Sequence, residues 1–235
     1  MATGPLDKSK KGTIKMAKLT IKSKTLAALE ELRGMDHRDL TGWAKGNGMD
    51  SAAGFSAFKK ALLENGIDFD ALRQEARGAQ GAALAAQATA SLTLFSDAKA
   101  KNDRFGICDK SGNPVWYGKF FDNDRDYNGE QSSGEMAAAK KAVWLASKVK
   151  EAIGAPALAL TLKVDAEWLC WANAVRMGAK SDVGGKARPL GEMAQKLGVV
   201  LTVEHIPGTE NPADKYTVCT GFLKYSETDI KTLVD

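Results

Sequence analysis

The sequence predicts an α/β protein built around a five-stranded mixed sheet flanked by helices, with a small N-terminal helical unit. Beyond residue 91, strand-like apolar segments alternate with helical ones in the order β-β-β-α-β-α-α-β-α, which is typical of a sheet covered by helices. Before residue 75, apolar residues recur every three or four positions, which indicates short helices.

Changes of composition divide the chain into five stretches. We expect a basic flexible arm, a small helical module, an alanine-rich linker, the α/β domain and a C-terminal tail, over residues 1–24, 25–74, 75–90, 91–225 and 226–235. The arm holds seven lysines against one acid, Asp7. Such an arm suits a polyanion, because neutralised phosphates release counterions. A solvated tail with no partner explains the lysines equally well.

Helical spacing and turn residues define the module. Leu26, Leu29 and Leu32 share one helical face, the Asn65-Gly66 pair marks a turn, and Asp68 is placed to cap a following helix. The module could bind nucleic acid, although its pattern is only weakly analogous to known binding modules. The linker has little to bury, so we expect it to be part helix and part flexible.

Strand and helix signals then follow in order through the α/β domain. Strand composition over three segments, with a turn at 110–114, predicts an antiparallel meander over 92–95, 104–109 and 115–121. A long helical stretch follows at 131–153. The remaining elements are expected as a strand at 157–164, helices at 166–177 and 189–197, a strand at 199–205 and a helix at 212–223.

Four acidic residues sit where this order brings them together. Asp97 and Asp165 end strands, at the edge where α/β sheets place their sites, while Glu135 and Asp214 lie early in helices. Each has an ordinary explanation as a turn former, a helix cap, a dipole partner or a surface residue. As a set they are all-oxygen ligands, which favour Mg²⁺ or Mn²⁺, and two such ions can cleave a phosphodiester.

Four stretches around these acids carry a family resemblance. They are Leu92–Asp97, Ser133–Ala139, Leu160–Ala166 and His205–Asp214, the last reading His-Ile-Pro-Gly-Thr-Glu-Asn-Pro-Ala-Asp. The chain from Leu92 to Tyr225 thereby resembles the ribonuclease H superfamily, and the last stretch resembles the closing motif of ribonuclease H domains in retroelement reverse transcriptases. The resemblance implies a ribonuclease H-like fold, with Asp97, Glu135, Asp165 and Asp214 as the catalytic and metal-binding residues.

The resemblance also implies a substrate and a reaction. We expect a metal-dependent endonuclease that uses two ions to hydrolyse the RNA strand of RNA–DNA hybrids. The alternatives are a DNA nuclease of the same fold, such as a resolvase or mobile-element enzyme, and a non-catalytic nucleic-acid-binding protein. Candidate contacts to nucleic acid are Lys99 and the basic segment between two helices, with Arg176, Lys180, Lys186 and Arg188.

Three residues depart from the pattern of cellular family members. Ala98-Lys99 follows the first aspartate where those enzymes usually have Gly-Ser, and Glu167 stands where many have a polar minor-groove contact. His205 precedes the Pro-Gly turn, so we expect a structural role for it at the end of a strand. These departures concern hybrid specificity more than metal binding.

Composition and cysteine spacing indicate the cellular compartment in which the protein acts. The sequence has no apolar run near the roughly 18 residues that span a bilayer, and no apolar secretory segment at its start. Its three cysteines, Cys108, Cys170 and Cys219, match no paired metal or redox spacing. We therefore expect a cytoplasmic protein with reduced thiols and no membrane partner. The oligomeric state is left open.

Overall fold

The structure is a computed structural model that describes residues 42–43, 45–46, 56, 59–60, 62–64, 66–121, 124–179, 185–226 and 228–235. The predictions for the basic arm, for most of the helical module and for Lys180 lie outside the described residues and stay predictions. Most of the described residues belong to the α/β domain and to the helix that precedes it.

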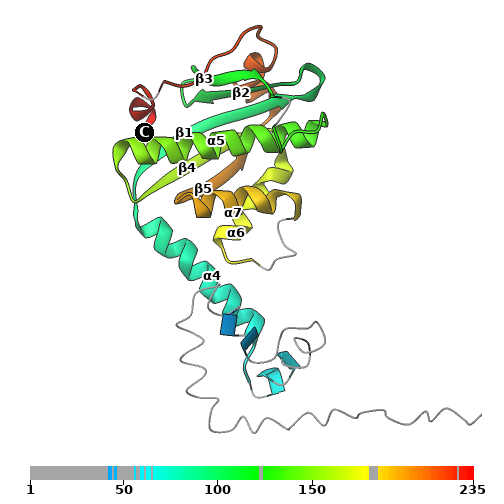
Figure 1. The fold of residues 1–235 in the computed structure, drawn as a ribbon, viewed down its shortest axis with the longest axis vertical. Helices are drawn as coiled ribbons and strands as arrows, with labels where there is room; N and C mark the ends of the chain where they lie inside the picture. Colours follow the sequence, from blue (N-terminus) through cyan, green and yellow to red (C-terminus); the bar gives the residue numbers. More distant parts are fainter. Residues whose placement is uncertain are drawn as a thin grey trace, which may run out of the picture.

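A five-stranded mixed sheet forms the centre of the domain, as predicted (Figure 1). Its strand order is β3-β2-β1-β4-β5, in which β1 pairs antiparallel with β2 and parallel with β4. The strands are β1 (Ala88–Lys99), β2 (Arg104–Asp109), β3 (Pro114–Lys119), β4 (Ala157–Val164) and β5 (Val199–His205).

Parallel pairing of β1 with β4 sets the level of the acidic residues. Leu92 pairs with Leu160 and Phe95 with Lys163. Two residues further along both strands, the same register places Asp97 level with Asp165. The carboxyl ends of the two central strands therefore bring these two acids side by side.

The long helix α5 (Gln131–Ile153) crosses one face of the sheet (Figure 1). Its buried side is mostly small, with Ala138 and Ala142 fully buried, so its backbone comes close to the apolar side chains of β1 and β4. Helix α7 (Arg188–Lys196) packs beside α5 and against β5. Within the described ranges no helix has both the length and the apolar character needed to cross a bilayer.

The opposite face is covered by a short segment instead of the helix expected at 212–223. That prediction is wrong: a single 3₁₀ turn, η5 (Asp214–Thr217), packs on β2, and the chain then runs along the β3 edge. There Leu223 and Tyr117 exchange backbone hydrogen bonds of 2.9 and 3.0 Å. The Phe222 ring occupies the space that a side chain at Gly118 would need. Backbone hydrogen bonds to the exposed edge of β3 thus replace the hydrogen bonds that a helix at 212–223 would have made.

The helix expected at 166–177 is also different in the structure. A 3₁₀ helix, η2 (Glu167–Ala172), leads into one α-helical turn, α6 (Asn173–Arg176). The side chain of Asn173 donates to the carbonyl of Val203 and accepts from its N–H, at 2.9 and 2.8 Å. The Asn173 side chain bonds to the outer edge of β5, where a further strand could otherwise pair. This contact holds the segment against the sheet as a 3₁₀ helix followed by one α-helical turn.

Most of the expected linker at 75–90 belongs to one continuous helix, α4 (Phe69–Ala86), and its last residues start β1. Asp68 caps α4 as predicted, accepting from two backbone N–H groups at 3.0 Å. Alanine favours helix strongly, and Gly81 lets α4 contact α6: a Cβ there would stand 2.2 Å from the Arg176 carbonyl oxygen. The glycine serves helix packing.

The segment after Ser226 is anchored to the sheet. Ile230 in η6 (Ile230–Leu233) is buried and packs against the main core. The backbone N–H of Asp235 donates to the Ser91 carbonyl at 2.8 Å, and its carboxylate accepts from the Thr93 hydroxyl at 2.8 Å. The expected tail therefore supports the start of β1.

Two glycines of α4 give a matched test of the α4–α6 contact. We expect Gly81→Ala to destabilise the fold by roughly 1–3 kcal/mol, because the new Cβ collides with backbone that cannot yield easily. Gly78→Ala is the control, since its Cβ would meet the Met177 carbonyl at an ordinary 3.7 Å and helix propensity improves by about 1 kcal/mol. Urea unfolding midpoints measure both, and equal effects would contradict the close contact.

Candidate active site

Asp97 lies inside β1, two residues before the strand ends, and is only 6% exposed. It shares a hollow, too small to hold a water molecule, with Glu135 from α5 and with Asp165, which directly follows β4. Ser96, Val164, Ala166 and Leu169 complete the walls. The structure thus brings three of the four predicted acids to one place.

The electrostatic environment of Asp97 disfavours its ionised form. Burial, as the largest cause, and the neighbouring charge of Asp165 raise the pKa of Asp97 from 3.8 to about 7. Asp214 adds both its charge and a hydrogen bond with the Asp97 carboxyl, so the fourth acid reaches the same cluster. The Ala98 N–H donates to Asp97 at 2.7 Å and opposes the rise. A nearby cation would relieve this repulsion.

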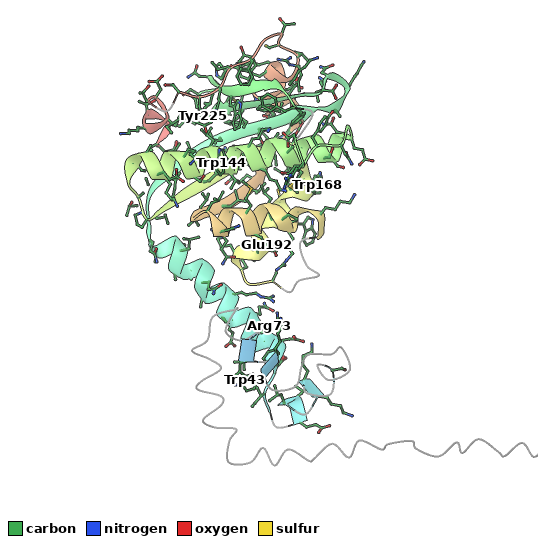
Figure 2. All side chains as sticks on the ribbon, in the orientation of Figure 1. Trp43, Arg73, Trp144, Trp168, Glu192 and Tyr225 are labelled. Carbon is green, nitrogen blue, oxygen red and sulfur yellow. The ribbon has the colours of Figure 1, made fainter. Side chains whose placement is uncertain are left out.

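Glu135 is fixed by neutral hydrogen-bond donors on both carboxylate oxygens. Gln131 Nε2 donates to Oε1 at 3.1 Å, and Trp168 Nε1 donates to Oε2 at 2.9 Å. Gln131 is itself anchored to the end of β1, because it also donates to the Ala98 carbonyl at 2.6 Å and accepts from the Ala100 N–H at 3.1 Å. Figure 2 shows Trp168 at the end of the sheet where α5 begins.

Close packing of α5 on β1 sets the position of Glu135. A Cβ at the preceding Gly134 would stand 3.2 Å from the Ala98 Cβ, which is tighter than nearly all real contacts. The glycine therefore allows the first turns of α5 to approach the strand that carries Asp97.

Asp165 lies in the bend between β4 and η2, half-buried. It does not cap η2, because the residue before that helix is Ala166 and no side-chain cap is present there. The turn after β5 closes over it, with the position of a Cβ at Gly208 only 3.3 Å from Asp165 Oδ2. The His-Ile-Pro-Gly stretch thus contributes a wall to the site, while His205 itself ends β5 and is exposed.

Asp214 is the most exposed of the four acids and is placed by Asn211. The buried Asn211 amide donates to the Ser96 carbonyl at 3.1 Å, and its oxygen accepts from the Ala213 N–H at 3.1 Å. Gly106, the cross-strand partner of Asp97, allows this loop to approach, since a Cβ there would stand 2.6 Å from the Ala213 carbonyl oxygen. Lys99 Nζ lies 3.5 Å from Asp214 Oδ1.

The predicted nucleic-acid contacts fall in two places. Lys99 borders the acidic cluster, whereas Arg176 lines a pocket between α4, α7 and β5 and does not line the hollow of the acids. Arg188 is largely buried and pairs with Glu192 at 2.8 Å. Lys186 is exposed in η3, and Lys180 is outside the described residues.

The donor set suits a hard cation. All four acids offer only carboxylate oxygen, the ligand that Mg²⁺ and Mn²⁺ prefer. The pKa of Asp97 is raised first by burial and then by the charges of Asp165 and Asp214, and a bound cation would offset both effects. In the described part of the chain, no three His, Cys, Asp or Glu side chains already form a ligand group for one ion. Coordination of two ions by the four acids therefore stays a prediction.

Three positioning residues were not singled out from the sequence for the contacts they make. Gln131 precedes Glu135 by one helical turn, and that spacing is the signal that could have identified it. Trp168 follows Asp165 by three positions, and that closeness in sequence is the signal that could have identified it. Asn211 stood inside the quoted closing stretch without a role of its own.

Comparison of the chain with protein-family models, with curated proteins and with solved structures finds no match. What the site does is therefore inferred from its own side chains and from their arrangement on the sheet.

The pKa of Asp97 predicts how stability without metal depends on pH. The folded state binds this proton more tightly than the unfolded state, so stability present below about pH 4 is lost as pH rises to about 7. The loss is up to roughly 4 kcal/mol. In chelator at about pH 8, Asp97→Asn should therefore melt at a higher temperature than the natural protein.

The control for this melting experiment is Glu75→Gln, which removes an exposed acid on α4. That variant should follow the natural protein across the pH range. An Asp97→Asn protein no more stable than the natural one at high pH would contradict the crowded-carboxylate description.

Trp168→Phe tests the support of Glu135, because it keeps an aromatic ring and removes only the N–H donor. We expect metal affinity, measured by Mn²⁺ titration, to fall by roughly tenfold, as is usual when a group orienting a ligand is lost. Trp171→Phe is the matched control, since Trp171 is 60% exposed. Equal Mn²⁺ affinity of the two variants would exclude the role given to Trp168.

Proposed function

We propose that this protein is a metal-dependent endonuclease of the ribonuclease H type, which hydrolyses the RNA strand of RNA–DNA hybrids. The observation that carries the proposal is the buried carboxyl of Asp97, crowded by Asp165 and Asp214 and sharing a hollow with Glu135. Crowded carboxylates of this kind are unfavourable unless cations neutralise them.

The order of the elements supports the same proposal. The four acids come from a central strand, the long helix after the meander, the end of the neighbouring parallel strand and the segment after the last strand. Convergence of such distant residues at one sheet edge supports a shared role for them.

The side chains around the hollow would have different roles in the reaction. Asp97, Glu135, Asp165 and Asp214 would hold two divalent ions, which supply an activated water and stabilise the leaving oxygen. Trp168 and Gln131 orient Glu135 without adding charge. Lys99, beside Asp214, would contact a phosphate of the bound strand.

Discrimination of RNA from DNA would come from the shape of the hybrid and from its 2′-hydroxyl groups. Glu167 is exposed directly after the Asp165 bend, where it would face this groove. A carboxylate there can accept a hydrogen bond from a 2′-hydroxyl, but it repels phosphates. Because of Glu167, the preference for RNA–DNA hybrid over DNA has to be measured in a cleavage assay.

A cleavage assay tests the proposal directly. Labelled RNA–DNA hybrid, double-stranded RNA, duplex DNA and a four-way junction are incubated with the protein in Mg²⁺ and then in chelator. We expect only the hybrid to be cut, in its RNA strand, with cleavage falling to the chelated level in Asp97→Asn because a metal ligand is lost.

The other outcomes of this assay are equally informative. Cutting of duplex DNA or of the junction would replace the proposal with a DNA nuclease that uses the same acids. Tight binding of all substrates without cleavage in Mg²⁺ or Mn²⁺ would replace it with a non-catalytic binding protein.

A further inference from the structure

A row of three cationic residues crosses the end of the sheet next to the acidic cluster. Lys99 of β1 is the cross-strand partner of Arg104 in β2, and Arg104 is the partner of Lys119 in β3. Directly opposed residues project from the same face of a sheet, and like charges in that position repel each other. We call Lys99, Arg104 and Lys119 the basic row.

Little in the described structure neutralises the basic row. Lys99 lies 3.5 Å from Asp214, but neither Arg104 nor Lys119 forms an ion pair with any acid in the described ranges. Arg104 is 8% exposed, and its Nε has no hydrogen-bond partner there. Three aligned cations that are neutralised only at one end favour an anion lying across them.

Two exposed phenyl rings stand at the β3 edge where the row ends, with Phe222 opposite Gly118 and therefore on the other face of this edge from Lys119. Phe121 follows Lys119 by two positions, and Phe222 packs over Gly118; each is 55% exposed, and their ring centroids are 6.5 Å apart. The Arg104 guanidinium donates to the Gly221 carbonyl and so holds the segment that carries Phe222. Figure 1 shows this C-terminal segment, in orange and red, running beside β3.

We propose that the basic row, with Phe121 and Phe222, binds a single-stranded nucleic-acid segment that continues from the duplex at the acidic cluster. Lys99, beside Asp214, and the exposed Lys119 would contact phosphates, while the buried Arg104 would add its charge beneath the strand. The strand would then pass round the β3 edge, where the two rings would stack with bases. The identity of the duplex rests on the proposed function, but binding of the single strand does not.

Exposed rings favour an unpaired strand over a continuous duplex. Bases inside a duplex are stacked on each other and present only their edges, whereas unpaired bases offer their flat faces to aromatic side chains. A cationic track beside aromatic rings is the usual combination in proteins that hold single strands. We therefore expect the basic row and the rings to bind an unpaired extension of the substrate.

The test compares a blunt RNA–DNA hybrid with the same hybrid carrying a single-stranded DNA extension at one end or at the other. Binding is measured by fluorescence anisotropy with full-length Asp97→Asn protein, so that cleavage cannot interfere. We expect one extended hybrid to bind about fivefold tighter or more than the blunt hybrid, as stacking of one base would produce.

Two variants assign the effect to the proposed residues. Phe222→Leu keeps an apolar side chain over Gly118 and should abolish the preference for the extended hybrid. Lys119→Ala should weaken binding of the extended hybrid and reduce the slope of log affinity against log salt by about 0.7, the value for one contact to a single strand. Because Lys119 is exposed and outside the core, this variant does not depend on the packing of Phe222.

Matched controls come from distant surfaces. Trp144→Leu removes a partly exposed ring of α5, and Lys231→Ala removes an exposed lysine of η6; both should keep the preference. Equal affinity for blunt and extended hybrids, or a preference unchanged in both Phe222→Leu and Lys119→Ala, would overturn the inference. Failure of hybrid cleavage with the preference retained would overturn only the proposed function.

Discussion

The carboxyl group of Asp97 is held where a negative charge is unfavourable. It is buried in the central strand, level with Asp165 and close enough to Asp214 for that residue to raise its pKa. Mutual repulsion would drive such groups apart if their backbones were free to move. The site therefore depends on packing that keeps the acids together whether or not a cation is bound.

Much of that packing relies on glycines that let backbone come close. Gly134 brings α5 against β1, Gly106 admits the loop that carries Asp214, and Gly208 lets a turn close over Asp165. A Cβ at any of them would meet a neighbouring atom at 3.3 Å or less. These glycines lie beside the acids in space although they are far apart in sequence.

The groups that orient the acids are neutral. Trp168 and Gln131 hold Glu135, and Asn211 holds the loop before Asp214, all through uncharged N–H donors. A lysine or arginine in any of these places would neutralise the cluster and compete with a metal ion. Neutral donors fix the geometry and leave the negative charge available.

The regular elements could be predicted from the sequence, because their local pattern agrees with their final surroundings. The strands at 104–109, 157–164 and 199–205 and the helix at 131–153 have the expected bounds. The prediction failed where tertiary contacts decide, at the 212–223 segment that pairs with β3 and at the 166–177 segment that Asn173 bonds to the edge of β5. The four acids could be found from strand order, but the partners of Glu135 depend on side-chain directions that strand order does not determine.

Opposite charges lie side by side at this end of the sheet, with the acids on one side and the basic row on the other. Lys99 belongs to both, because it leads the row and lies 3.5 Å from Asp214. A divalent ion bound by Asp214 would take over the negative charge that now attracts Lys99. The lysine would then be free to contact a phosphate, so binding of metal and binding of the nucleic-acid strand would strengthen each other through this one ion pair.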